Sequence, residues 1–240
     1  MSIRGVYRSS VKFLLVCLIL SGDDIFIGLC IVSFASHLLW IDIDGPLDAF
    51  FTADSSCIWN GPNFDLVFYF TVVQLVSSVV GIGATIGNAM TFYKYDIRTA
   101  LLGAMVFRIA TGLFDLIMVQ RWNLEVGISD KVIFLFGDAV FAEAARILVM
   151  LPIKMLASQI ITAGKVTMSY SLIDSFQFLG LSISRITGII LSKSLSVNAQ
   201  HNGECNFERL PQLVAFSHMV FPILTLTTIY MQIPRILLSK

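Results

Sequence analysis

Charged residues are scarce in this sequence, and their signs balance. Only 13% of the 240 residues are charged, 16 Lys and Arg against 16 Asp and Glu, whereas about 25% is usual for a soluble domain. The hydrophobic share is 56%, and the mean hydropathy is +0.83. This composition excludes a water-soluble domain. Because no basic surplus is left to neutralise phosphates, we also expect no nucleic-acid partner.

The usual signatures of soluble catalysis are missing too. No CxxC, HExxH, GxGxxG or GxxxxGK[ST] pattern occurs, and the 3 histidines are scattered over different segments. The G-x-S-G motif of a rhomboid-type protease and the paired Asn-Pro-Ala motifs of an aquaporin are absent as well. We therefore expect no enzyme, no metal site and no cofactor. The classes of function that remain are solute transport and a membrane scaffold or receptor.

Long apolar runs dominate the chain. Six of them approach the roughly 20 residues that a membrane helix needs. The predicted fold class is all-α and transmembrane, with one six-span domain over residues 1–240, of which 25–240 holds the helices and loops. The expected spans are Ile25–Ile41, Phe64–Met90, Thr99–Val119, Val132–Met155, Met168–Ser192 and Leu210–Ile233.

Residues 1–24 form a short basic segment that allows two interpretations. Three basic residues precede the apolar run Phe13–Leu20, as in a signal peptide. No A-x-A-like cleavage site follows, and two aspartates come directly after Gly22. We therefore favour a partial span over a cleaved signal.

Basic residues in short loops are biased to the cytoplasmic side, and here they give a consistent orientation. With the N-terminus inside, nine basic residues fall in inside segments, and four fall in outside loops: Arg121, Lys131, Lys193 and Arg209. Segment 42–62, with four aspartates and no basic residue, is the clearest outside loop. We expect an integral, multi-pass membrane protein with both termini cytoplasmic, in a membrane that the sequence does not identify.

The 4 cysteines are too few for a disulfide scaffold. Cys17 and Cys30 lie in apolar runs, whereas Cys57 and Cys205 fall in expected outside loops. A disulfide between Cys57 and Cys205 would join the first outside loop to the last, and such a bond is chemically reasonable outside the cytosol. From the sequence we favour two free loop thiols and keep the disulfide as the alternative.

Seven ionisable residues remain in or near the expected spans. An ionised side chain at the bilayer centre costs about 2.5 to 3.5 kcal/mol, so such residues face each other, a water-filled cavity or a polar solute. They are Arg108, Asp115, Asp138, Glu143, Arg146, Asp174 and Arg185.

The spacing of these residues limits how they pair. Arg108 and Asp115 are seven residues apart, about 10 Å along a helix, so each needs a partner elsewhere. Glu143 and Arg146, at i and i+3, form either an internal ion pair or a substrate contact.

The fifth expected span carries a polar stripe on an otherwise apolar helix. Asp174, Gln177 and Arg185 lie on one side of it, together with Ser184. The stripe is either a packing face held by hydrogen bonds or the lining of a solute pathway.

The stretch Arg121–Phe141, RWNLEVGISDKVIFLFGDAVF, resembles the folate-biopterin transporter family of the major facilitator type. The Gly-Ile-Ser-Asp element at 127–130 is the most specific part of the match, and the stretch 151–180 continues it. The matching positions include Asn123, Gly127, Ser129, Asp130, Gly137, Asp138, Pro152, Leu156, Ala157, Gly164, Ser175 and Gly180.

This chain departs from the family pattern at two places. Where the family has a Pro-Gly-x-Glu element, the chain reads Ala163-Gly164-Lys165-Val166, so the acidic residue is gone. Where the family has an Asn on the following helix, the chain has Phe178. These losses bear on the solute more than on the fold.

The resemblance implies a secondary transporter for folates, biopterin or related pteridines, with the lipid bilayer, a small anionic or pteridine-like solute and protons as partners. It covers the carboxyl-terminal six helices of a twelve-helix fold. We therefore expect, in this order, a fragment, a truncated gene model, or a half-transporter that joins its missing N-terminal half or a second copy.

If the chain is part of such a transporter, its buried charges have expected roles, and Asp138 is the one membrane-embedded carboxylate that the family pattern also predicts. Arg108, Asp115 and Asp138 are the first candidates for coupling or for contact with the anion. The other candidates for binding or coupling are Glu143, Arg146, Asp174, Gln177 and Arg185. The alternative is a degenerate six-span scaffold that transports nothing.

Overall fold

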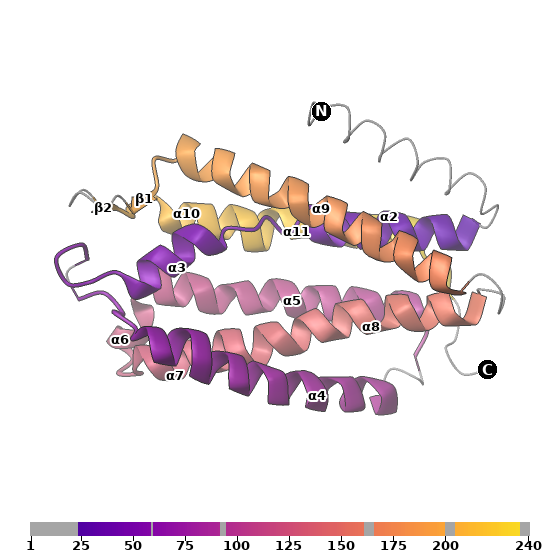
Figure 1. The fold of residues 1–240 in the computed structure, drawn as a ribbon, viewed down its shortest axis with the longest axis horizontal. Helices are drawn as coiled ribbons and strands as arrows, with labels where there is room; N and C mark the ends of the chain where they lie inside the picture. Colours follow the sequence, from indigo (N-terminus) through magenta and orange to yellow (C-terminus); the bar gives the residue numbers. More distant parts are fainter. Residues whose placement is uncertain (1–23, 59, 92–94, 161–165, 200–204, 236–240) are drawn as a thin grey trace.

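The computed structural model describes the chain from residue 24 to residue 235, without residues 59, 92–94, 161–165 and 200–204. Within these residues the protein is a bundle of long helices that run between two ends (Figure 1). The basic N-terminal segment, with its partial-span and signal-peptide interpretations, lies outside the described residues, and so does Gly164.

Six helical rods build the described part of the bundle, and some of them include π-helical segments, labelled η. The rods are α2 (Asp24–Leu38), η1 (Phe68–Val72) with α4 (Val73–Thr91), α5 (Ile97–Val119), α7 (Asp130–Phe134) with η3 (Leu135–Ala142) and α8 (Glu143–Ile160), α9 (Val166–Ser194), and α10 (Leu210–Val214) with η4 (Ala215–Val220) and α11 (Phe221–Gln232). The short elements are α3 (Asp44–Thr52), α6 (Trp122–Glu125), and the paired strands β1 (Asn198–Ala199) and β2 (Cys205–Asn206).

The predicted all-α transmembrane fold class is confirmed. Each expected span overlaps one of the rods, with ends that differ by a few residues; the largest difference is in the fourth, which continues to Ile160 instead of ending at Met155. Within the part of the chain that the structure describes, four helices are long and apolar enough to cross a membrane: Phe68–Asn88, Ile97–Val119, Thr167–Ser194 and Leu210–Gln232.

The remaining two rods differ from these four in length or in charge. Helix α2 is apolar, but the structure describes only 15 residues of it. The rod of α7, η3 and α8 is long, but it carries Asp138, Glu143 and Arg146 in its middle. Large apolar side chains such as Val79 on α4 and Ile190 on α9 are exposed, which suits helices that face lipid.

The predicted outside loop at 42–62 is not a simple loop, because it contains α3. Leu47, Phe50 and Phe51 are buried on one side of this helix, at the i, i+3 and i+4 spacing that makes a short helix amphipathic. The aspartates that suggested an open loop lie on and around α3.

Two apolar clusters fill the two ends of the bundle. One joins α2, α5, α8, α9 and α11 around residues such as Leu29, Leu101 and Leu156. The other joins α3, the last turn of α5, the α7–η3 region and α10, and in it the rings of Phe51 and Phe134 lie 5.0 Å apart. The middle of the bundle, between the clusters, is where the charged positions of the rods lie.

Two glycines allow close contacts that place the elements around this middle region. A Cβ on Gly180 of α9 would lie 2.6 Å from the carbonyl oxygen of Phe34, so only glycine lets α9 approach the backbone of α2 this closely. A Cβ on Gly112 of α5 would lie 2.8 Å from Cβ of His218 on η4. These contacts fix α2 against α9 and η4 against α5.

Candidate functional site

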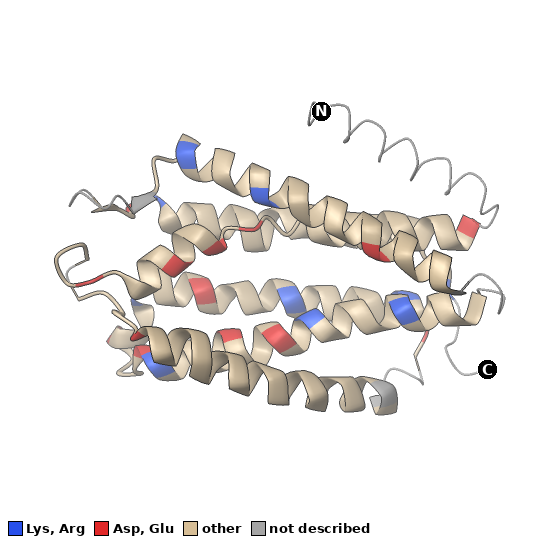
Figure 2. Cartoon of the chain, viewed as in Figure 1, with Lys and Arg blue, Asp and Glu red and all other residues tan. Residues whose placement is uncertain are grey.

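Two adjoining cavities lie in the middle of the bundle. Their volumes are about 300 and 580 Å³, and both are lined by Trp40, Asp44, Arg108 and Arg146. Charged positions occur along the middle of α5, α8 and α9 and not only at helix ends (Figure 2). The two cavities thus gather charged groups that hydrocarbon cannot solvate.

Seven of the eight candidate residues from the sequence line these cavities. The larger cavity is lined by Arg108, Asp115, Asp138, Glu143 and Arg146, and the smaller by Arg108, Arg146, Gln177 and Arg185. Asp174 lines neither of the two. Its carboxylate lies 3.4 Å from Nζ of Lys154, which does line the smaller cavity.

Arg108 and Asp115 both find partners on other elements. The guanidinium carbon of Arg108 lies 4.3 Å from the centre of the Trp40 ring, a cation–π contact. The Trp40 ring also stacks on His218, with centroids 4.5 Å apart and an interplanar angle of 13°. Asp115 lies 2.8 Å from Nδ1 of His218. A continuous chain of contacts therefore runs from Arg108 through Trp40 and His218 to Asp115.

Trp40 is held in place by backbone contacts just after α2. Ser184 of α9 donates its hydroxyl hydrogen to the carbonyl oxygen of Trp40 at 2.7 Å, and it accepts the backbone N–H of Asp42 at 2.8 Å. The serine is fully buried. In the predicted polar stripe of α9, Ser184 therefore positions the chain between α2 and α3.

Three π-helical segments each bring a polar side chain to the larger cavity. Tyr69 lies on η1, Asp138 on η3 and His218 on η4, and all three line that cavity. π-Helical turns are rare and occur frequently at functional sites. Their convergence on one cavity is independent support for a functional site there.

Carboxylates crowd the end of the larger cavity that α3 covers. Asp44 and Asp48 line it, and Asp48 accepts the hydroxyl hydrogen of Tyr69. Desolvation by the surrounding protein and repulsion from Asp42 raise the pKa of Asp44 to about 6. This carboxyl consequently takes up a proton as the pH falls through that value.

Glu143 and Arg146 make the i, i+3 ion pair that their spacing allows. Arg146 donates to both carboxylate oxygens of Glu143, at 2.8 and 2.6 Å. Both residues also line the larger cavity, and the Arg146 side chain is 53% exposed. The pair is therefore both an internal ion pair and part of the cavity wall.

Arg185 joins α9 to the segment before α3. Its Nε lies 2.9 Å from a carboxylate oxygen of Asp42, and 64% of its side chain is exposed. Gln177 lines the smaller cavity between this pair and the Lys154–Asp174 pair. The α9 stripe contains both a packing contact, at Ser184, and cavity-lining groups, at Gln177 and Arg185.

The Gly-Ile-Ser-Asp element lies in the connection between α5 and α7 and lines neither cavity. Arg121 donates to both oxygens of Asp130, at 3.0 and 2.9 Å, and Asn123 donates to Asp130 at 2.6 Å and to the Ile128 carbonyl at 3.1 Å. Arg121 and Gly127 have positive φ angles of 62° and 77°. Ser129 is the N-cap of α7 but makes no side-chain cap. We call Arg121, Asn123 and Asp130 the α5–α7 clamp.

Pro152 lies inside α8 and is buried, and the helix continues beyond it to Ile160. Proline has no N–H, so the carbonyl of Leu148, four residues earlier, lacks its usual partner in the helix. The helix therefore contains a weakened turn just after the charged pair Glu143 and Arg146.

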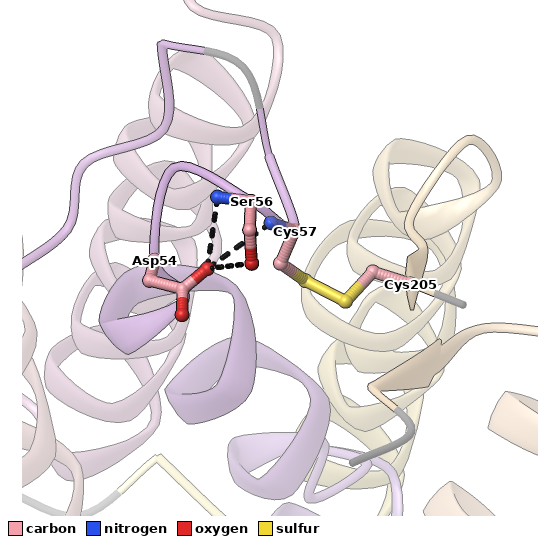
Figure 3. Close-up of a disulfide and its surroundings, with 4 residues drawn as sticks. All are labelled: Asp54, Ser56, Cys57 and Cys205. Carbon is pink, nitrogen blue, oxygen red and sulfur yellow. Dashed lines mark hydrogen bonds between the residues drawn. A yellow bond between two sulfur atoms is a disulfide. The ribbon is translucent and has the colours of Figure 1, made fainter. Parts of the chain in front are cut away.

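Cys57 and Cys205 form a disulfide with Cα atoms 5.5 Å apart, so the favoured interpretation of two free thiols was wrong (Figure 3). Sequence alone gives no distance between residues 148 positions apart. In the fold, the turn after α3 lies beside the β1–β2 pair. Hydrogen bonds from the Ser56 hydroxyl and from the backbone N–H groups of Ser56 and Cys57 lower the pKa of Asp54 and order this turn.

A Cys57→Ser variant should therefore remove a redox-dependent mobility shift. The wild-type protein should migrate differently on electrophoresis with and without reductant, because the disulfide links two distant parts of the chain. The matched control is Cys30→Ser, which removes a buried free thiol and should keep the shift. A shift that survives in Cys57→Ser contradicts the disulfide.

The sequence did not reveal Trp40, Asp44 or His218 as members of the site. Trp40 and His218 are separated by most of the chain, and each reads as an ordinary residue of an apolar run. The available signal was a histidine within a 23-residue membrane helix, Leu210–Gln232. An ionisable residue there indicates a functional site by default.

The family model described as the BT1 family matches residues 8–238. The probable folate-biopterin transporter 4 of Arabidopsis thaliana is 26% identical over 151 residues, covering 58% of this chain and 30% of that relative's length. Its name describes a transporter, in agreement with the expectation that this chain is not an enzyme. No solved structure matches the chain significantly.

Proposed function

Because this chain belongs to the BT1 family, we propose that it is part of a secondary transporter for a folate, biopterin or related pteridine. The name of the Arabidopsis relative supports this solute class. The observation that carries the proposal is Arg108, a guanidinium in the middle of an apolar bundle that lines both cavities. Among the described residues, no carboxylate lies within ion-pair distance of it.

Arg108 is the proposed anchor for a carboxylate of the solute. A guanidinium binds a carboxylate through two parallel charge-assisted hydrogen bonds. The larger cavity, at about 580 Å³, is within the size range of small-molecule sites. Trp40, Phe51, Tyr69 and Phe134 line it, so a planar ring would meet aromatic surface near the charged anchor.

Asp138 and Asp115 are the proposed coupling residues among the carboxylates of the site. Both line the larger cavity together with Arg108. An acid in such surroundings can exchange a proton with the solution while an anion occupies the same cavity. We propose Glu143, Arg146, Gln177 and Arg185 as further contacts on the solute pathway, with Asp174 acting through Lys154.

A second six-helix unit is proposed to cover the polar side of the bundle. Arg146 lies in the middle of the α7–η3–α8 rod and Arg185 lies within α9, and more than half of each side chain is exposed, at 53% and 64%. Lipid cannot solvate them there. In major facilitator transporters the solute site lies between two halves, so we propose the missing N-terminal half as the cover. A second copy of this chain is the alternative.

The proposed orientation places the disulfide end outside the cytosol and both termini inside. Disulfides persist in oxidising compartments, which supports this side for Cys57 and Cys205. The basic-residue count of the loops supports the same orientation.

Uptake measurements test the proposed function. The protein, expressed from its natural gene in cells that lack folate and pterin uptake, should accumulate tritiated folic acid or biopterin, saturably and above a vector control, and should not accumulate labelled methionine. If the protein reaches the membrane and accumulates neither solute, the transporter assignment fails and the scaffold alternative stands.

A further inference from the structure

His218 has surroundings that a packing histidine does not need. It is only 4% exposed, it stacks on Trp40, and its Nδ1 lies 2.8 Å from Asp115. Its other ring nitrogen, Nε2, is buried without a hydrogen-bond partner. Because a Cβ at residue 112 would collide with His218, a glycine is required at position 112 for His218 to pack this closely against α5.

The unpartnered Nε2 defines which protonation state suits this arrangement. With a neutral ring, Nδ1–H donates to the Asp115 carboxylate, and only a lone pair on Nε2 is left without a partner. A proton added at Nε2 would instead leave a buried N–H donor of a charged ring unsatisfied, which is far more costly. The observed arrangement therefore suits neutral His218, and protonation favours a rearrangement.

Other charged groups line the same cavity, and so does the titratable hydroxyl of Tyr69 on η1, which donates to Asp48. The charged groups are Asp44 and Asp48 on α3, Arg108 and Asp115 on α5, Asp138 on η3, and Glu143 and Arg146 on α8. Glu143 and Arg146 neutralise each other. The remaining groups are four carboxylates and Arg108, so the surroundings of the imidazole are acidic overall.

We propose that His218 and Asp115 form a proton-binding site, and that Trp40 transmits its charge state to Arg108. As the site rearranges and water reaches Nε2, one proton passes from a hydronium ion to the Nε2 lone pair: an N–H bond forms, an O–H bond of the hydronium breaks to leave water, and the Asp115 carboxylate balances the new charge. Histidine ordinarily changes charge between pH 5 and 8. The inference rests on the proposed function only for its link to the solute.

The stack explains how the proton would affect Arg108. In the structure the Trp40 ring contacts both the Arg108 guanidinium and the His218 imidazole. A protonated His218 places a second cation on the same π system, so Trp40 holds Arg108 less strongly. Arg108 is then freer to bind an anion, so proton binding and anion binding favour each other.

Fluorescence of Trp40 tests the proton site without any transport. The protein has 3 tryptophans, and Trp59→Phe with Trp122→Phe leaves Trp40 as the sole emitter. An imidazolium in contact with an indole quenches its fluorescence, so emission should fall in one step as the pH is lowered from 8 to 5. His218→Gln should abolish the step, and Asp115→Asn should shift the pH at which the step occurs, because the counter-charge is gone.

The control is His37→Gln, which removes the histidine of α2 instead of His218 and should leave the fluorescence step in place. A flat emission in the Trp40-only protein overturns the proton site, and this result needs no further variant. A step that survives His218→Gln, or that His37→Gln removes, overturns it as well. An unmoved midpoint in Asp115→Asn, a near-isosteric change, rejects the pairing with Asp115.

The failures of the two proposals are distinguishable. A Trp40 step in a protein that accumulates neither folic acid nor biopterin refutes the transporter and leaves the proton site standing. Uptake of either solute together with flat Trp40 emission supports the transporter and refutes the proton site. If both proposals hold, folic acid uptake at pH 5.5 should exceed uptake at pH 7.5, and His218→Gln should remove that difference.

Discussion

Replacing Arg108 with glutamine should abolish folic acid uptake while the protein still inserts into the membrane. The substitution keeps the length and polarity of the side chain but removes the charge and the fork that hold a carboxylate. Losing one partner of a buried, hydrogen-bonded charge pair costs about 2–5 kcal/mol, so affinity should fall by roughly 30-fold or more. Arg108→Lys keeps the charge without the fork and should give an intermediate loss.

A comparison of folic acid with biopterin tests whether Arg108 binds a carboxylate of the solute. Biopterin has no carboxylate, so if it is also transported, its uptake should depend on Arg108 much less than folic acid uptake does. The matched control is Arg209→Gln, the same change at an exposed position of the α10 N-cap that lines neither cavity. Wild-type folic acid uptake in Arg108→Gln would reject Arg108 as the anchor.

Asp130→Asn should destabilise the protein strongly although Asp130 lines neither cavity. Its carboxylate accepts from both terminal nitrogens of Arg121 and from Asn123. Breaking a fully buried pair costs about 3–5 kcal/mol. Here the Arg121 and Asp130 side chains are 22% and 18% exposed, so we expect about 2–4 kcal/mol after allowing for solvent screening.

The loss of stability can be measured by thermal denaturation of the protein in detergent, with size-exclusion chromatography used to monitor the folded fraction at each temperature. The apparent melting temperature of Asp130→Asn should be lower than that of the wild type by several degrees. Glu125→Gln removes the same charge from an exposed residue of the adjacent helix α6 and should change it little. Equal melting temperatures for Asp130→Asn and wild type would mean that the α5–α7 clamp does not hold this connection together.

The helices could be predicted from the sequence because apolar runs of membrane length leave the chain few alternatives. The α5–α7 clamp shows where the motif misleads. The Gly-Ile-Ser-Asp element carried the family resemblance, yet Asp130 and Gly127 shape a connection and line neither cavity. A specific motif marks positions that tolerate few residues, and a tight turn with positive φ angles imposes that restriction as strongly as a binding site does.

The candidate site could be predicted only in part, and the reason is geometric. Charges such as Arg108 and Asp138 are visible in a sequence because lipid makes them costly, whereas Trp40 and His218 are not costly in an apolar run. Their importance comes from a stack between segments that are distant along the chain. The π-helical turns that carry Asp138 and His218 also leave no mark in the apolar pattern.

The Cys57–Cys205 disulfide makes most of the bundle a closed covalent ring. Between these residues, 148 positions apart, lie η1–α4, α5, α7–η3–α8 and α9, while α2, α3 and α10–η4–α11 lie outside the ring. A single cut anywhere inside the ring leaves one connected molecule. The disulfide also ties the turn after α3 to strand β2, which precedes α10, so these two segments stay joined whatever movement the helices between them make.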